Sequence, residues 1–131
     1  MTYKKTVAVD LDGVLAQYSG FQGPDIIEDP IPGADEFLKQ LAGKYVVIVH
    51  TARQTETAVH WLEKHGLLDF VDGVNYCQIN NRAGKPVAIA YIDDRAIRFE
   101  GHFAAVLREV DRMADKNERK DNGGVYIPPG L

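Results

Sequence analysis

VAVDLDGVLA, residues 7–16, joins a short apolar run to two carboxylates. The first three residues are apolar and rich in β-branched side chains, which is typical of a strand buried on both faces. Because residues two apart on an extended chain point to the same side, Asp10 and Asp12 can face one site while Leu11 faces the core. Gly13 lets the chain leave the strand sharply and approach a ligand closely.

Carboxylates at the end of a buried strand are costly unless a cation or a proton neutralises them. The carboxyl ends of the strands are also where open α/β sheets bind ligands. An ordinary polar turn is the alternative interpretation of Asp10 to Gly13, since Asp and Gly are common turn residues.

Apolar runs and helical periodicities alternate along the rest of the chain. We expect strands at 6–11, 45–49, 70–76 and 87–92, and helices at 34–41, 55–65 and 102–115. This alternation predicts right-handed crossovers and a mainly parallel sheet in an α/β fold. The last helix is expected to bury a stripe formed by Phe103, Val106, Leu107, Val110 and Met113.

The length of 131 residues favours one domain. We expect a core over residues 1–116 and a C-terminal tail over 117–131, which is charged and then rich in Gly and Pro. Residues 14–32 form an irregular segment punctuated by Gly and Pro. This segment is expected to act as a lid or substrate wall, or to pack onto the body of the protein.

Composition and charge narrow the function classes. The net charge of −4 argues against an extended nucleic-acid surface, which usually needs a basic excess. The single cysteine, Cys77, cannot form an internal disulfide, which fits a reducing compartment. With no signal-peptide core and no apolar run near the ~18 residues needed to span a membrane, a cytoplasmic protein without a membrane partner is expected.

Polar residues follow three of the expected strands, and a lysine lies in the loop before the last of these. In a parallel sheet these ends share one edge, so the residues should gather there. The set comprises Asp10, Asp12, Thr51, Arg53, Lys85, Asp93 and Asp94. The set supplies carboxylates that can bind a metal ion, together with a hydroxyl group, a lysine and an arginine. These functional groups suit phosphoryl transfer.

Each group has a physical role in such a reaction. Asp10 and Asp93 can supply oxygen ligands to Mg²⁺, and a carboxylate can attack phosphorus to form an aspartyl-phosphate. Asp12 can protonate the leaving group and later deprotonate water. Thr51 and Lys85 can hold the phosphoryl oxygens. Arg53 is placed to touch phosphate or substrate, although an arginine there can equally form a surface ion pair.

The segments VAVDLDGVL, VIVHTAR, GKP and AYIDDR, in that order, resemble the four motifs of the haloacid dehalogenase (HAD) superfamily, specifically its Asp-based phosphatases. The similarity covers roughly residues 6 to 98. The resemblance implies that Asp10 is the nucleophile and Asp12 the acid/base. The presence of Asp12 argues against the dehalogenase branch, which lacks the second aspartate.

The same resemblance assigns the other motifs. It matches Thr51 to the Ser/Thr of the second motif and Lys85 to the lysine of the third. It implies that Asp93 binds Mg²⁺ and that Asp94 supports the metal site, alongside Asp10 and Asp12. The cofactor expected from this resemblance is therefore Mg²⁺.

The resemblance also implies a three-layer, doubly wound, Rossmannoid core. The spacing between the motifs leaves no room for a cap domain, so the chain is similar to the capless members of the superfamily. The function expected is hydrolysis of a phosphomonoester in a small phosphorylated substrate, by a protein that can also form homo-oligomers.

Two other functions are compatible with the same residues. Receiver-type signalling modules also place acids, Thr and Lys around Mg²⁺ and a phospho-Asp, although in a different order along the chain. A polynucleotide end-phosphatase would suit an open site, but the net charge and the absence of a GxxxxGK phosphate loop weaken that alternative.

Overall fold

The structure is a computed structural model that describes residues 4–76, 84–116 and 129–130. Cys77 and nearly all of the predicted tail lie outside the described residues. Within the part of the chain that is described, no helix has the length and apolar character needed to cross a membrane.

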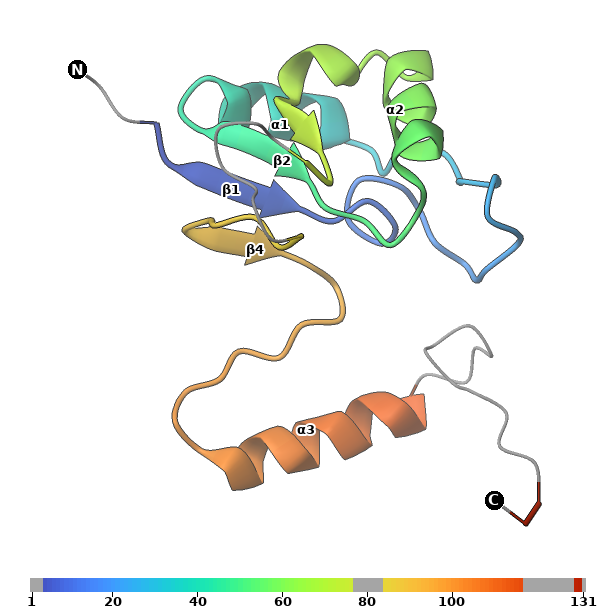
Figure 1. Cartoon of the computed structure of the whole chain (residues 1–131), viewed down its shortest axis with the longest axis vertical. Helices are drawn as coiled ribbons and strands as arrows, with labels where there is room; N and C mark the ends of the chain where they lie inside the picture. The colour runs from blue at the N-terminus through green and yellow to red at the C-terminus, as the bar shows by residue number, and fades with distance from the viewer. Residues whose placement is uncertain (1–3, 77–83, 117–128, 131) are drawn as a thin grey trace. The chain divides into compact units, whose positions relative to one another are not determined.

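Four parallel strands form the sheet, in the order β3-β2-β1-β4 (Figure 1). They are β1 (Thr6–Val9), β2 (Val46–Val49), β3 (Gly73–Val74) and β4 (Ala90–Ile92). The chain moves outward from β1 to β2 and β3, and then returns to the opposite side of β1 as β4. This parallel sheet with flanking helices confirms the predicted α/β class.

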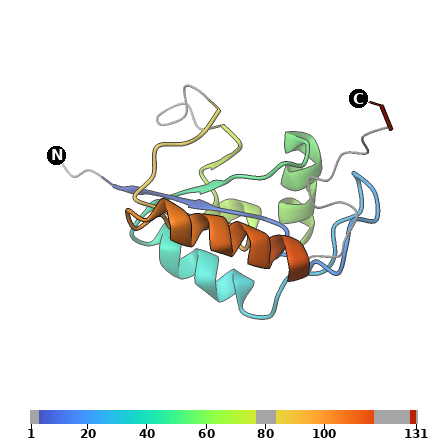
Figure 2. The same ribbon diagram turned by 90° about the horizontal axis from the view of Figure 1, so that it is seen from below.

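The helices α1 (Ala34–Ala42) and α2 (Thr55–Lys64) connect the first three strands, and a short 3-10 helix, η1 (Leu68–Phe70), follows α2. Acidic residues occupy the first turn of α1, and Gly43 caps its carboxyl end, where its N–H bonds the carbonyls of Lys39 and Leu41. In Figure 2, α1 runs along the direction of β1. Both helices lie within a residue or two of the predicted ranges.

The core lies between the sheet and these helices. Alternate residues of the two central strands share one face, because Val7 pairs with Val47 and Val9 with Val49. They form one buried cluster with side chains of α1 and α2 that include Leu38, Trp61 and Leu62. The first two strands and first two helices therefore hold the sheet edge in a fixed position.

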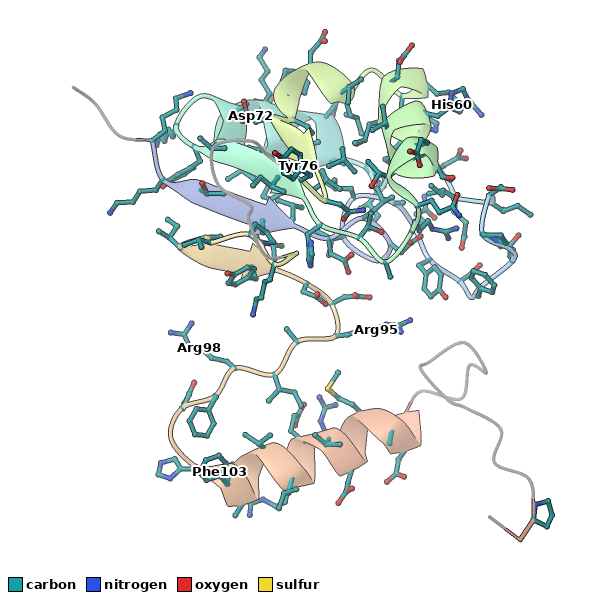
Figure 3. The ribbon with its side chains drawn as sticks, in the orientation of Figure 1. His60, Asp72, Tyr76, Arg95, Arg98 and Phe103 are labelled. Atoms are coloured by element: carbon teal, nitrogen blue, oxygen red, sulfur yellow. The ribbon has the colours of Figure 1, made fainter. Side chains whose placement is uncertain are left out.

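The third expected strand is shorter than predicted. Residues 68–70 form η1, and only Gly73 and Val74 pair with β2. Asp72, labelled in Figure 3, extends the pairing: its N–H donates to the Val47 carbonyl, and its carboxylate accepts the Val47 N–H, both at 2.8 Å. A side chain thus replaces part of the backbone ladder.

The apolar run of the fourth expected strand favours burial, yet each of residues 87–92 is exposed or only partly buried. Val87 and Ile89 are 73% and 59% exposed. The strand register with β1 starts at Ala90, just after a bond from the Ile89 N–H to the Thr6 carbonyl at 2.9 Å. In the described sheet β4 is an end strand next to β1, so only one of its edges is paired. The apolar run alone could not distinguish an end strand from a central one.

Contacts divide the chain into two compact units, Met1–Asp94 and Arg95–Leu131. The second unit contains α3 (Phe103–Lys116), with Phe103, labelled in Figure 3, as its first residue. The predicted burial of a stripe on this helix, formed by residues such as Phe103, Leu107 and Val110, stays a prediction. The predicted boundary at residue 116 stays a prediction.

The segment of residues 17–29, here called the 17–29 loop, lies at the end of the sheet to which β1 and β2 point (Figures 1 and 2). Its two ends are joined by a bond from the Gln17 N–H to the Asp29 carbonyl, 2.9 Å, and Ser19 bonds the carboxylate of Glu28. The indole N–H of Trp61 donates to the Glu28 carbonyl at 2.9 Å, which fastens the loop to α2.

Candidate functional site

Three carboxylates meet where β1 and β4 end. Asp10, Asp93 and Asp94 each offer an oxygen, and these oxygens lie within 4.8 Å of one another. The N–H of Asp10 donates to the Ile92 carbonyl at 2.8 Å, which ties the two strand ends together. The chain changes direction between these two strands, and such a switch point is where open α/β sheets bind ligands.

Burial raises the pKa of the Asp10 carboxyl from 3.8 to about 7. The N–H of Leu11, 2.8 Å from Asp10 Oδ1, opposes this rise, whereas the negative charges of Asp93, Asp94 and Asp12 add to it. Removal from water and like-charge repulsion both disfavour the ionised carboxylate. A cation bound by the three carboxylates would instead favour the ionised form of Asp10.

Gly13 makes room for this cluster. Its φ of +84° is in the left-handed region, and a β-carbon at this position would lie 2.6 Å from Asp94 Cγ. The carboxylate of Asp94 therefore packs directly against the backbone that follows Asp12. Any side chain at residue 13 would displace one of the three acids.

The residues present fit a divalent cation. Oxygen ligands at ~2.1 Å from Mg²⁺ lie at most about 4.2 Å apart, so the three carboxylates need only a small closure to share the ion. Asp10 is half-buried while Asp93 and Asp94 are exposed, which leaves room for water and for a substrate oxygen. Asp12, also predicted as part of the metal site, is not a member of this group of three.

Asp12 is instead paired with Arg53. Asp12 Oδ2 accepts from Arg53 Nε at 2.8 Å and Asp12 Oδ1 from Nη2 at 3.1 Å, a two-point contact. Nη1 of the same guanidinium donates to the carbonyls of Gly23 and Pro24 at 3.1 and 3.0 Å. Of the two roles considered for Arg53, the geometry shows the ion pair, and contact with phosphate stays a prediction.

Thr51 lies just beyond β2, beside the end of β1. Its hydroxyl oxygen accepts the N–H of Arg53 at 3.1 Å, and its own N–H donates to Asn75 Oδ1 at 2.8 Å. Asn75 Nδ2 also donates to the Arg53 carbonyl, 3.3 Å, and to the Thr55 hydroxyl, 3.2 Å. The turn from β2 into α2 is thereby held in shape at the edge of the site.

Lys85 precedes β4 and is exposed. Its Nζ lies 4.6 Å from the ring centroid of Tyr91, a cation–π contact. The Tyr91 hydroxyl donates to the Pro86 carbonyl at 2.6 Å, so the lysine rests on a fixed ring. Its predicted contact with a phosphoryl oxygen stays a prediction.

Sequence reasoning did not single out Asn75, whose amide orders the turn at the edge of this site. Asn75 is the non-glycine residue with a positive φ, +59°, among the described residues, and its position directly after β3 in DGVN was the available signal. His50 directly follows β2, and its Nδ1 is buried without a hydrogen-bond partner in the described part of the chain. No feature of the sequence pattern distinguished that nitrogen.

Comparison with known proteins adds a likeness in fold. No family model and no curated protein matches the chain. A solved structure, that of a conserved protein coded by a locus of Bacteroides thetaiotaomicron, is similar at 25% identity with a TM-score of 0.58. The match covers 89% of this chain and 100% of that one. That protein is described only as conserved, so the likeness supports the α/β fold and assigns no activity.

Proposed function

We propose that this chain is a Mg²⁺-dependent phosphomonoester hydrolase of the HAD type that works through an aspartyl-phosphate on Asp10. The observation that carries the proposal is the convergence of Asp10, Asp93 and Asp94 at the switch point of a parallel sheet. The order of the four motif-like segments supports it independently. The proposal includes the finer architecture, a doubly wound core without a cap domain.

Asp10 is the nucleophile in this proposal. One of its carboxylate oxygens attacks phosphorus, the bond from phosphorus to the ester oxygen breaks, and the departing oxygen takes the proton of Asp12. The products of this step are a free alcohol and a phosphoryl group bonded to Asp10. When bound to the three carboxylates, Mg²⁺ would neutralise charge on the phosphate and favour the ionised form of Asp10.

Water completes the cycle. Asp12, now ionised, takes a proton from water while the water oxygen attacks phosphorus, and the bond from phosphorus to Asp10 breaks. Inorganic phosphate leaves, the Asp10 carboxylate is restored, and Asp12 is again protonated. Thr51 and Lys85 are assigned to bind the phosphoryl oxygens as charge shifts on them.

Turnover of p-nitrophenyl phosphate tests the proposal. We expect activity that requires Mg²⁺, is abolished by EDTA, and falls about 10³-fold or more in Asp10→Asn. Asp69→Asn, which alters an exposed aspartate in η1, is the matched control and should retain activity. Activity that survives Asp10→Asn would refute the mechanism. A stable phosphoryl adduct with acetyl phosphate and no turnover would instead indicate a signalling module.

A further inference from the structure

Arg53 joins two parts of the molecule that are far apart in sequence. Its side chain is only 8% exposed, although it lies in the turn that follows β2. One guanidinium makes four hydrogen bonds, two to the carboxylate of Asp12 and two to backbone carbonyls of the 17–29 loop. The planar guanidinium of Arg53 therefore binds both the proposed acid, Asp12, and the 17–29 loop.

The arginine is fixed at its backbone as well. The Arg53 N–H donates to the Thr51 hydroxyl, and the Arg53 carbonyl accepts from Asn75 Nδ2. A two-point guanidinium–carboxylate pair fixes orientation as well as distance, which a single lysine ammonium cannot do. The position of the Asp12 carboxylate is thus set from the β2–α2 turn.

One of the loop carbonyls bound by Arg53, that of Gly23, lies close to an exposed apolar residue, Ile26. The Ile26 N–H donates to the Gly23 carbonyl at 3.4 Å, and Ile26 Cδ1 is 3.8 Å from the place of a β-carbon on Gly23. Ile26 and Phe21 are 50% and 56% exposed. Because the same carbonyl accepts from Arg53, a shift of the arginine would move this part of the loop.

We propose that Arg53 is a positioning residue: it holds Asp12 and the 17–29 loop in one arrangement and acts on catalysis through Asp12. The proposal rests on the phosphatase function proposed above. It replaces direct phosphate binding as the role of Arg53, because the guanidinium is committed to Asp12 and to two carbonyls. Loss of this arrangement misplaces the proton donor and leaves the phosphate-binding groups intact.

The dependence on the leaving group tests this role. A weakly basic leaving group such as p-nitrophenolate departs without a proton, whereas an alkoxide needs one from Asp12. We expect Arg53→Lys and Arg53→Gln to lower kcat for an alkyl phosphate by about 10- to 100-fold, with a smaller loss for p-nitrophenyl phosphate and little change in KM.

Two comparisons sharpen the kinetic test. Asp12→Asn should show the same dependence on the leaving group, and adding Arg53→Gln to Asp12→Asn should cause little further loss. Arg108→Gln, at an exposed arginine of α3, is the control and should behave as the unaltered protein. Equal losses for both substrates with a raised KM would overturn the proposal, since they indicate phosphate binding.

Hydrogen exchange gives a measurement that does not depend on turnover. The N–H groups of Gln17, Ser19 and Ile26 are bonded within the loop. We expect these amides to exchange faster in Arg53→Lys and in Asp12→Asn, with those of α1 unchanged. Unchanged loop exchange in both variants overturns the proposal even if the protein proves inactive. Faster exchange in an inactive protein would support the positioning role and refute only the phosphatase function.

Discussion

Asp10 and Asp12 are separated by one residue and lie in opposite electrostatic settings. Asp10 faces two other carboxylates and is partly removed from water, while Asp12 is paired with the guanidinium of Arg53. The alternation of side chains along the strand end explains why two acids so close in sequence can share an edge of the sheet. Their partners come from β4 and from the turn after β2, respectively.

The raised pKa of Asp10 predicts how stability depends on pH. Between its ordinary pKa of 3.8 and the native value of about 7, the folded protein holds a proton that the unfolded chain has released. The free energy of unfolding should therefore decrease as the pH rises through this window. Asp10→Asn lacks this dependence, so the variant should become more stable than the unaltered protein above pH 7 in EDTA.

Thermal melting from pH 5 to 8.5 checks this expectation. With Mg²⁺ added, the difference between the two proteins at pH 8 should shrink or reverse, because the cation binds the ionised carboxylate. Parallel pH profiles in EDTA would contradict the raised pKa. An unchanged difference on addition of Mg²⁺ would count against a cation site that includes Asp10.

Much of the site could be predicted from the sequence, for a geometrical reason. Asp10, Asp93 and Asp94 follow strands, and the ends of parallel strands meet at one edge, so their convergence needed only the strand assignments. The pairing of Asp12 with Arg53 could not be predicted, because these residues are 41 positions apart and the contact depends on the path of the 17–29 loop. Composition alone does not determine such a path.

The turn between β2 and α2 depends on one side chain from the end of β3. Asn75 accepts the Thr51 N–H and donates to the Arg53 carbonyl, so a single amide joins the two connections. Its positive φ is a conformation that asparagine tolerates better than most residues. Both properties explain why an asparagine suits this position.

Asn75→Gly separates the two properties. Glycine adopts a positive φ without strain, so the variant keeps the backbone conformation while it removes the side-chain hydrogen bonds and leaves the Thr51 N–H unpaired. We expect a loss of about 1–3 kcal/mol in the free energy of unfolding. Urea denaturation measures it, and a variant as stable as the unaltered protein would show that water replaces the amide at no cost.

The elements differ in how well the sequence predicted them. For α1 and α2 the apolar spacing and the flanking glycines agreed with tertiary packing on the sheet, and Leu38 and Trp61 are buried in the core. For β4 the same kind of apolar pattern was present, yet Ile89 is exposed. The spacing of apolar residues indicates which face of a strand or helix is apolar. Whether another part of the chain covers that face depends on the tertiary structure.

The division of the molecule into two units has a thermodynamic consequence. The three carboxylates all belong to Met1–Asp94, whereas α3 belongs to Arg95–Leu131. A ligand stabilises only those regions whose opening destroys its site, and at 100 times its dissociation constant the gain is about 2.7 kcal/mol.

We therefore expect Mg²⁺ to slow hydrogen exchange at the amides of β1 and β4 and to leave α3 unchanged. The measurement is hydrogen exchange with Mg²⁺ and with EDTA. Equal protection of α3 would show that the two units open together.

The hydrogen bond from Trp61 to the Glu28 carbonyl makes tryptophan fluorescence a probe of the 17–29 loop. Trp61 is the only tryptophan of the chain, and its indole reaches from α2 to the 17–29 loop. Its fluorescence spectrum should respond to hydration of that indole when the loop detaches. Stopped-flow emission can therefore time the movement of this segment during turnover without any attached dye.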